Sequence, residues 1–366
     1  MRIAFVTEHD PDNLNAWSGV SHGMLHGLRQ AFERVETVSV PHYDALQGSL
    51  DARLRHVGGI ASKHVRERDV DVAICQGASA IPYLDVSVPT VYWHDSTWAA
   101  LYQGHFPETL DFATFRSRHP GFAQWDAAAL GRASRVFFSS EWLVSHVQRD
   151  YGIPARKLRV VPFGANLEGA PSHVEAMSSA QSRSPDTCNL LFIGVEWRRK
   201  GLDRALRLVR RLRRLGKPTQ LTVIGARPRA LRVRLARGVT RLGFLDKTIP
   251  DERGRMIRAL RGAHFLVHPA RYEAFGCVLA EANAYAVPVI GTSTTGLLTV
   301  VTPGVNGDLY APDEFVEKAS QRILDLLDTP DAYQNLASSS YREYERRLNW
   351  PSAAQKIRES LEELVS

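Results

Sequence analysis

Short apolar runs alternate with stretches of helical period along most of the chain. In the first half the runs are RIAFVTE, VETVSV, DVAICQG, PTVYWHD, SRVFFSS and LRVVPFG. The alternation restarts later with CNLLFIGV, TQLTVIGA, VTRLGFL, AHFLVHPA and VPVIGT. Strands that alternate with helices in this way are typical of a parallel sheet covered by helices. The pattern therefore predicts two α/β domains, each with a doubly wound, Rossmann-like sheet.

The two series of runs are separated by a segment of different composition. Residues 166–187, NLEGAPSHVEAMSSAQSRSPDT, are rich in Ser, Ala and Pro and poor in large apolar side chains. We therefore expect an N-terminal domain over residues 1–167, a linker over 168–187 and a C-terminal domain over 188–345. The tail, residues 346–366, has helical period and is interrupted at Trp350-Pro351, where proline kinks the chain or begins a new helix.

Composition is that of an ordinary soluble globular protein, with 44% hydrophobic and 23% charged residues among 366. The first residues run directly into an apolar segment without a basic leader, and no apolar run approaches the roughly 18 residues of a membrane span. We therefore expect a cytoplasmic protein. Cys75, Cys188 and Cys277 are far apart and in no C-x-x-C pair, which predicts free thiols and neither a disulfide framework nor a zinc site.

The net charge of +7 is concentrated in one segment. Between Arg198 and Arg241 there are fourteen Arg and two Lys against one acid, which gives +15 and leaves −8 for the rest of the chain. Within it, Leu206, Val209, Leu212 and Leu215 recur at three-residue spacing, as in an amphipathic helix. The arginines are explained by a solvated helix face. The alternatives are peripheral contact with an anionic membrane surface or an acidic partner, and, less well supported without interleaved aromatic residues, nucleic-acid binding.

Open parallel sheets bind ligands beyond the carboxyl ends of their strands, so the loops after each strand are where chemistry is expected, in a cleft between the domains. After the first strand, the loop TEHDPDNLNAWSGVSHG brings Gly19 to a helix start and Gly23 one turn further on. A strand, a glycine-bearing loop and a helix start suit the approach of a phosphate, although a purely structural loop explains them as well.

Two histidine–aspartate pairs end strands of the first domain. His94 and Asp95 stand where the run PTVYWHD stops, and such a pair can position or polarise a hydroxyl group. His9 and Asp10 form a second, weaker pair after the first strand. A histidine that only caps a loop is the alternative for both.

In the second domain, LLFIGVEWRRKGLDRAL again gives a strand, a turn and a helix. Lys200, together with Arg198 or Arg199, places positive charge just before Gly201, at a helix start that already favours an anion. A diphosphate is the ligand that this arrangement predicts. Chance placement within a basic segment is the alternative, most of all for Arg198 and Arg199.

The stretch RYEAFGCVLAEANAYAVPVI sets Glu273 and Glu281 eight positions apart among small and apolar residues, although an unpaired buried carboxylate is costly. We expect Glu273 in a loop that reaches into the cleft and Glu281 on the following helix, with alanines around it that leave room for a ligand. Gly276 and the amides of Phe275 to Val278 would form the helix N-terminus.

Two D-x-D triplets, Asp10 to Asp12 and Asp69 to Asp71, raise the question of a metal site. Such triplets arise easily by chance, and the second flanks the start of a strand, where solvated carboxylates are expected. We therefore predict no metal and no cofactor.

The sequence resembles the retaining nucleotide-sugar glycosyltransferases of family 4, which have the GT-B fold. The most specific match is EAFGCVLAEANAYAVPVIGTSTTGL…GVNGDLY, with further similarity in FIGVEWRRKG, VVPFGAN and the final Trp-containing helix. The resemblance covers the whole chain. It implies an acceptor-side first domain, a nucleotide-sugar-binding second domain, and a last helix that crosses back onto the first domain.

The resemblance also implies roles for individual residues. Glu281 would bind the ribose hydroxyls, Glu273 would contact the donor sugar, and Lys200 with a neighbouring arginine would neutralise the departing diphosphate. His94 would lie near the transferred sugar and the acceptor. The remaining donor contacts that it implies are Gly19, Leu245, Phe275, Gly276 and Val278.

We therefore expect a metal-independent glycosyltransferase that moves a sugar from a nucleoside diphosphate donor, UDP or GDP, to a glycan, lipid-linked or small-molecule acceptor. Its site would stabilise an oxocarbenium-like sugar and a diphosphate electrostatically. The alternatives are a nucleotide-sugar epimerase of the same fold and a protein that binds surfaces through residues 198–241. The family's arginine after the strand glycine is replaced here by Val195, Glu196 and Trp197.

Overall fold

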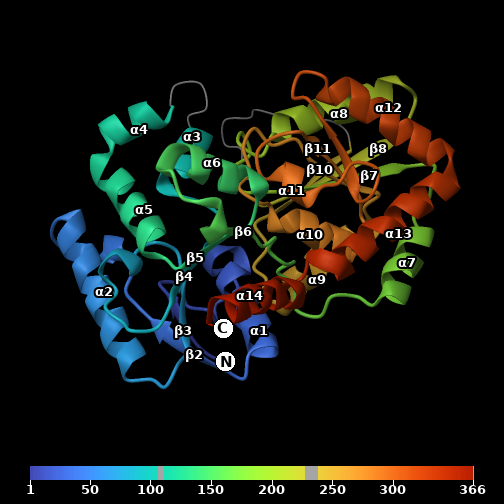
Figure 1. Cartoon of the computed structure of the whole chain (residues 1–366). Helices are drawn as coiled ribbons and strands as arrows, with labels where there is room; N and C mark the ends of the chain where they lie inside the picture. Colours follow the sequence, from blue (N-terminus) through green and yellow to red (C-terminus); the bar gives the residue numbers. More distant parts are fainter. Residues whose placement is uncertain (106–110, 227–237, 366) are drawn as a thin grey trace. The chain divides into compact units, whose positions relative to one another are not determined.

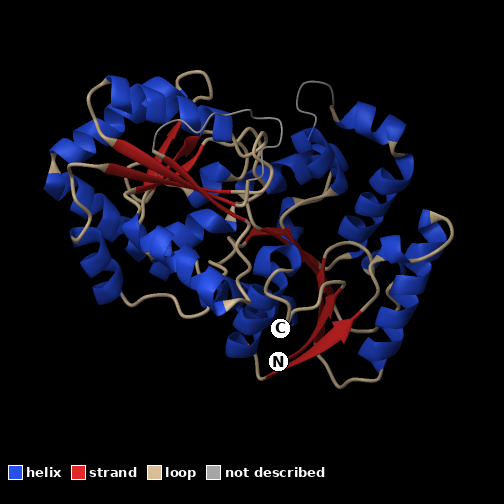
Figure 2. Cartoon of the chain, turned by 180° about the vertical axis from the view of Figure 1, so that it is seen from behind, coloured by secondary structure: helices blue, strands red, loops and turns tan. Residues whose placement is uncertain are grey.

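Two compact units make up the chain in the computed structural model, which describes residues 1–105, 111–226 and 238–365. Unit 1 comprises Met1–Gly164 with Trp350–Ser366, and unit 2 comprises Ala165–Asn349. Each unit has its own buried apolar core. Figure 1 labels most of their elements and Figure 2 distinguishes strands from helices.

Unit 1 is built on a six-stranded parallel sheet in the order β2-β1-β3-β4-β5-β6. All six apolar runs predicted in the first half became its strands: β1 (Arg2–Thr7), β2 (Arg34–Ser39), β3 (Val72–Gln76), β4 (Thr90–His94), β5 (Arg135–Phe138) and β6 (Leu158–Val160). The order reverses between β1 and β3. In a doubly wound sheet, the loops after these two strands open the crevice in which ligands bind.

Helices join these strands: α1 (Val20–Ala31), α2 (Leu50–Arg66), α3 (Trp98–His105), α4 (Phe112–Arg118), α5 (Pro120–Arg132) and α6 (Glu141–Tyr151). The last helix, α14 (Trp350–Val365), packs against α1. Contact is close because Gly23 and Gly27 have no side chains: a Cβ on Gly23 would lie 2.1 Å from the indole of Trp350. Proline at position 351 falls in the first turn of α14, so it begins a new helix rather than kinking an existing one.

Unit 2 is a second six-stranded parallel sheet, in the order β12-β11-β10-β7-β8-β9. Its strands are β7 (Cys188–Ile193), β8 (Thr219–Ile224), β9 (Val239–Gly243), β10 (Phe265–His268), β11 (Val289–Thr292) and β12 (Gly307–Tyr310). Numbered from β7, this is the strand order of the dinucleotide-binding fold, and it reverses between β7 and β10. The predicted fold class, two doubly wound α/β sheets, is confirmed.

The helices of unit 2 are α7 (His173–Gln181), α8 (Leu202–Arg214), α9 (Pro250–Gly262), α10 (Cys277–Ala284), α11 (Leu297–Val300), α12 (Phe315–Asp328) and α13 (Pro330–Arg347). The three-residue periodicity correctly marks the buried face of α8, where Leu206, Val209 and Leu212 are inside. Leu215, the fourth residue of that series, lies just past the helix end and is 50% exposed.

The segment expected to link the domains contains an ordered helix. Ser172 and Glu175 form a capping box at the start of α7, and Ala176 and Ala180 pack on α13. Arg183 is buried and donates hydrogen bonds to the carbonyl oxygens of Arg261, Tyr285 and Ala286 and to the hydroxyl of Tyr333. The small residues on which the linker prediction rests allow close helix packing in unit 2, and the linker itself stays a prediction.

Candidate functional site

Two loops of unit 2 meet where the strand order reverses, between β7 and β10. The loop after β7 carries Lys200, and it passes so close to the loop after β10 that a Cβ on Gly201 would lie 2.0 Å from the carbonyl oxygen of Pro269. Gly201 also has a φ of +80°, which glycine adopts without steric cost. Glycine is therefore required at this crossing, and the crossing brings Lys200 to Glu273.

A bidentate ion pair holds the same two loops together. The two terminal nitrogens of Arg271 donate to the two carboxylate oxygens of Asp203, both at 2.9 Å. The backbone N–H of Arg271 also donates to the carbonyl oxygen of Arg199 at 2.8 Å. Because Asp203 is in the first turn of α8, this pair fixes the start of the helix relative to the loop that carries Glu273.

Glu273 is a carboxylate only 6% exposed, and it has three positively charged or hydrogen-bonding partners. Lys200 forms an ion pair with Oε2, Nε2 of His268 lies 2.9 Å from the same oxygen, and a terminal nitrogen of Arg199 lies 3.9 Å from Oε1. Burial alone would raise the pKa of Glu273, but the charge of Lys200 and the hydrogen bond from His268 outweigh it and hold the pKa well below its usual range. Glu273 is therefore ionised at neutral pH, and His268 donates to it.

The backbone of Glu273 is fixed by the loop after β11. Its N–H donates to the hydroxyl of Thr295 at 3.1 Å, and its carbonyl oxygen accepts from that hydroxyl at 2.7 Å. Gly276, with a φ of +91°, precedes α10, and a Cβ there would lie 3.2 Å from Cγ of Glu273 and 2.8 Å from Leu279. The carboxylate is thus held in place from both its backbone and its side chain.

Glu281 lies on α10 as expected, and one oxygen of its carboxylate is already paired. Nζ of Lys247 lies 2.8 Å from its Oε1 and also donates to the carbonyl oxygen of Asn166 at 3.1 Å. Glu281 itself is only 3% exposed. Lys247 follows β9, two residues after the predicted Leu245, and sequence reasoning missed it even though every strand-following loop was a candidate.

The structure distinguishes the two arginines that the sequence left equivalent. The side chain of Arg199 reaches the carbonyl oxygen of Tyr272 at 3.2 Å and faces Glu273. Arg198 is exposed, and its backbone carbonyl accepts from Arg271. Arg199 is therefore the arginine of the Glu273 site.

The other residues predicted for the donor site have mixed environments. Phe275 and Leu245 are buried, and Val278 is half-buried in the first turn of α10. His268 was not predicted as a site residue; its signal is its place as the last residue of β10, directly before the loop that carries Glu273.

In unit 1, His94 ends β4 and is held by the next loop. Nδ1 lies 3.1 Å from both the backbone nitrogen and the carbonyl oxygen of Ser96. A carboxylate oxygen of Asp95 lies 3.4 Å from Nδ1. Burial lowers the pKa of His94 to about 4, so the ring is neutral at pH 7.

A strained loop covers His94. Trp17, Ser18 and Gly19, which directly precede α1, have φ values of 45°, 58° and 84°. Left-handed backbone costs about 1–3 kcal/mol at each residue other than glycine, and such strain clusters at ligand sites. The indole of Trp17 stacks on His94 with ring centroids 4.5 Å apart and on His9 at 5.6 Å. Gly19 is thus the end of a left-handed turn that carries an aromatic ring over the predicted histidine.

The second predicted pair, His9 and Asp10, is divided by the structure. His9 packs on Trp17, whereas Asp10 is exposed and its carboxylate accepts from the N–H of Asp12. Glu8, which the sequence reasoning passed over, lies 3.7 Å from Nε2 of His42, and burial raises its pKa.

The two D-x-D triplets behave as ordinary surface carboxylates. Arg2 forms ion pairs with both Asp69 and Asp71. Within residues 1–105, 111–226 and 238–365, no group of three or more His, Cys, Asp or Glu side chains is placed to hold a metal ion. Metal independence stays a prediction.

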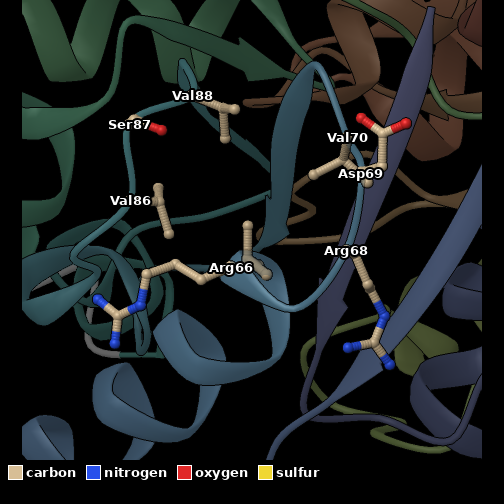
Figure 3. Close-up of a pocket in the computed structure, with 8 residues that line it drawn as sticks. Arg66, Arg68, Asp69, Val70, Val86, Ser87 and Val88 are labelled. Carbon is tan, nitrogen blue, oxygen red and sulfur yellow. The ribbon is translucent and has the colours of Figure 1, made fainter.

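A surface pocket in unit 1 lies at the opposite edge of the sheet from His94. It is formed by the end of α2 and the segments that lead into β3 and β4 (Figure 3). Arg66, at its rim, pairs with Asp85 at 2.8 Å, and Asp69 pairs with Arg2. Its lining residues are Val65, Arg66, Arg68, Asp69, Val70, Val86, Ser87 and Val88. The pocket contains none of the predicted site residues.

The basic segment has less unpaired charge than its sequence implies. Arg211 contacts Ser320 and Glu317, Arg213 donates to the carbonyl oxygen of Thr219, and Arg207 lies 3.5 Å from Asp203. Part of the segment, residues 227–237, lies outside the described residues. No helix in the described part of the chain is long and apolar enough to cross a membrane.

Comparison with known proteins gives sequence matches, among them a family model within unit 2, and matches to solved structures of the same fold. A family model described as "Glycosyl transferases group 1" matches residues 187–329. The chain is 32% identical over 219 residues to D-inositol 3-phosphate glycosyltransferase of Xylanimonas cellulosilytica, and 28% identical over 257 residues to glycogen synthase of Mycobacterium tuberculosis. These matches cover 56% and 66% of this chain but only 51% and 59% of the relatives. The chain thus spans little more than half the length of the curated relatives it matches.

Solved structures match the whole chain at low identity. Sucrose-phosphate synthase from Thermosynechococcus elongatus has a TM-score of 0.71 at 19% identity, with 100% of this chain and 99% of that chain covered. WaaG, a glycosyltransferase involved in lipopolysaccharide biosynthesis, has a TM-score of 0.67 at 18% identity, with 98% of both covered. HepE of Anabaena, in complex with UDP and glucose, has a TM-score of 0.65 at 16% identity, with 99% of both covered. These likenesses establish the fold.

Proposed function

Because the chain belongs to the group 1 glycosyltransferases, family 4, whose fold is GT-B, we propose that it transfers a sugar from a nucleoside diphosphate sugar to an acceptor hydroxyl group with retention of configuration. The observation that carries the proposal is the buried Glu273–Lys200 pair at the strand-order reversal of unit 2. A charged pair is costly to bury, and its place is the ligand crevice of a doubly wound sheet.

The residues around this pair suit a diphosphate and a developing sugar cation. Lys200 and Arg199 supply two positive charges to the leaving diphosphate, and the N-terminus of α10, capped by Gly276, supplies backbone N–H groups. Glu273 is ionised, so its charge stabilises positive charge at the anomeric carbon. Glu281 accepts from the ribose hydroxyls, with Lys247 holding its other side.

His94 serves the acceptor side through a hydrogen bond from its neutral ring, not as a base. Burial opposes formation of the imidazolium. The acceptor oxygen forms its bond to the anomeric carbon while the bond to the diphosphate oxygen breaks. The electron pair of that bond leaves with the diphosphate, which also takes the proton of the acceptor hydroxyl.

UDP is the first nucleotide to test, because HepE was solved with UDP, and GDP is the second. The names of the relatives point to different acceptors, an inositol phosphate for one and glycogen for another. The acceptor class, whether glycan, lipid-linked or small molecule, is therefore not carried over from them.

Thermal unfolding with UDP, GDP, ADP and their sugars tests the proposal, since a ligand that binds only the folded state raises Tm. We expect one nucleotide to stabilise the protein. Glu281→Ala and Lys200→Ala should lose that rise in Tm, and they should lose nucleotide binding in calorimetric titration. Lys318→Ala is the control, since Lys318 pairs with Glu314 on the exposed surface of α12. Unchanged nucleotide binding in both site variants would refute the site assignment.

The epimerase of the same fold is the alternative reaction. Incubation with the stabilising sugar nucleotide alone, followed by NMR, separates the two, because an epimerase releases an altered sugar nucleotide without any acceptor. A glycosyltransferase gives at most slow hydrolysis under these conditions.

Cytoplasmic location and peripheral attachment through residues 198–241 belong to this proposal. Arg210 and Arg214 are exposed on α8 and support attachment to an anionic surface. Sedimentation with phosphatidylglycerol vesicles but not with phosphatidylcholine vesicles, lost in Arg210→Glu/Arg214→Glu, is the expected result. Equal recovery with both vesicle types would contradict it.

A further inference from the structure

The loops at the carboxyl edge of the unit 1 sheet contain no lysine or arginine. These loops follow the six strands and comprise residues 8–19, 40–49, 77–89, 95–97, 139–140 and 161–164. Four of the six loops contain acids, but Asp85 pairs with Arg66 at the opposite edge of the sheet. The first loop contains three acids, Glu8, Asp10 and Asp12. If the proposed function holds, this edge is where the acceptor is recognised, and its fixed charges are negative.

Arginines of neighbouring helices reach these loops, and each is already engaged there. Arg132 donates to the carbonyl oxygens of Ile81 and Leu84, and Arg66 pairs with Asp85 at 2.8 Å. Arg53 reaches the edge from α2, but it lies 3.3 Å from Asp44, so the two charges offset each other. Burial lowers the pKa of His9, and it lowers that of His94 to about 4, so both rings are neutral near pH 7. Arg116 and Arg118 are in the last turn of α4, not in a strand-following loop.

The groups that remain suit hydroxyl groups and apolar ring faces. The neutral ring of His94 supplies a hydrogen-bonding nitrogen, and the carboxylate of Glu8, which lies 3.7 Å from Nε2 of His42, accepts hydrogen bonds. The indole of Trp17 stands over His94, and its edge meets the ring of Phe163, with centroids 6.1 Å apart. Aromatic walls with a few polar groups that fix orientation are typical of small-ligand sites.

We propose that the moiety that receives the sugar is an uncharged saccharide or polyol, recognised through Glu8, His94 and Trp17, and that an acceptor with a phosphate or carboxylate on that moiety is excluded. This inference rests on the proposed glycosyl transfer and narrows its acceptor. A site lined by one sign of charge repels ligands of the same sign, and here the lining carboxylates oppose a phosphate that no cation of these loops neutralises.

Matched ligand pairs that differ only in one charged group test the proposal. The pairs are glucose with glucose 6-phosphate, glycerol with glycerol 3-phosphate, and methyl glucoside with methyl glucuronide. Binding is measured by saturation-transfer NMR on the full chain with saturating UDP, and turnover by UDP release from the sugar nucleotide that stabilises the protein most. We expect the neutral member to bind at least tenfold more tightly in every pair in which it binds.

Two sets of variants locate the effect. Asp12→Lys places a cation in the loop after β1. It should reduce the preference for the neutral over the charged ligand of a pair to less than threefold. Glu67→Lys makes the same change of charge at the C-terminal end of α2 and should leave the preference unchanged. Trp17→Ala should weaken binding of the neutral ligand at least fivefold, and Trp17→Phe, which keeps an aromatic ring, should restore most of it.

Three results would overturn the inference: a charged member that binds as tightly as its neutral partner, no binding by any neutral ligand at millimolar concentration, or an equal effect of Asp12→Lys and Glu67→Lys. If UDP binds through Glu281 while one of these results is obtained, the acceptor inference fails and the proposed transferase stands. If no nucleotide binds, the proposed function itself fails.

Discussion

Replacing Lys200 with methionine tests whether the Glu273 pair is a buried ion pair that the site depends on. Methionine keeps the length of the side chain but removes the ammonium group from a carboxylate that is 6% exposed. Loss of one partner of a buried pair typically costs about 3–5 kcal/mol. His268 still donates at 2.9 Å and Arg199 remains at 3.9 Å, so part of the stabilisation survives. We expect Lys200→Met to lower the free energy of unfolding of unit 2 by about 2–3 kcal/mol.

This loss converts into a measurable shift of melting temperature. Unit 2 spans Ala165–Asn349, and for domains of about 150–250 residues each kcal/mol shifts Tm by about 2–4 °C. Lys200→Met should therefore lower Tm by about 4–12 °C, as measured by calorimetry and by urea unfolding followed by circular dichroism. The same variant should lose UDP affinity, because the cation that would face the diphosphate is gone.

The double variant Lys200→Met/Glu273→Gln provides the internal control. A neutral amide no longer leaves an unpaired buried charge, so this variant should recover more than half of the lost stability while UDP affinity stays low. The pKa of Glu273 is held below its unfolded value, so the stability that the pair contributes is complete above about pH 5 and is lost as the pH falls. Wild-type Tm in Lys200→Met, or no recovery in the double variant, would refute the ion-pair reasoning.

Three further variants test other parts of the structure. Gly201→Ala should lower the free energy of unfolding of unit 2 by more than about 3 kcal/mol, because its Cβ would lie 2.0 Å from the carbonyl oxygen of Pro269. Gly216 has a similar φ of +88° but no atom within 4 Å, so Gly216→Ala should cost only about 1–2 kcal/mol. Urea unfolding measures both. Lys247→Met should weaken UDP binding in calorimetry about tenfold, roughly 1.4 kcal/mol, because it leaves the carboxylate of Glu281 buried without Lys247. Lys318→Met should leave UDP binding unchanged. Equal UDP affinities in the two variants would contradict a role for Lys247. Burial raises the pKa of Asp126 to about 7, so the folded state holds an extra proton between about pH 4 and pH 7. The free energy of unfolding should therefore fall by on the order of 4 kcal/mol as the pH rises over this range. Asp126→Asn should remove this dependence on pH, and an unchanged dependence in the variant would show that another group titrates.

Alternation of apolar and polar residues was sufficient to predict the two parallel sheets. A parallel strand is buried on both faces, so it reads as a short apolar run, and all six runs quoted for the first half became strands. The run GVNGDLY, quoted for the family resemblance rather than for strand pattern, contains β12. The order of the strands, and with it the place of each crevice, does not follow from this local pattern, because it depends on which distant runs pair.

The expected linker shows what composition leaves open about local packing. Ser, Ala and Pro over residues 168–187 indicated a segment between two domains, which stays a prediction. Here the small side chains of Ala176 and Ala180 let α7 lie close against α13. Arg183 is buried, and it donates hydrogen bonds to carbonyl groups that are 78 or more residues away in the sequence. The partners that make this segment ordered are all distant in sequence.

The sequence by itself determined which residues could carry chemistry. Lys200 and Glu273 follow strands, His94 ends one, and Glu281 lies on the helix after one. Such positions of a doubly wound sheet are at the ligand edge. Only the tertiary structure decided which of them are partners. It paired Lys200 with Glu273, chose Arg199 over Arg198, and brought Lys247 to Glu281 and His268 to Glu273. The pairings of Lys200 and Arg199 with Glu273 join residues up to 74 positions apart, through loops that meet because glycine at 201 lets two backbones pass. Local pattern encodes the strands and their ends, whereas the distances between charges depend on how those ends are packed together.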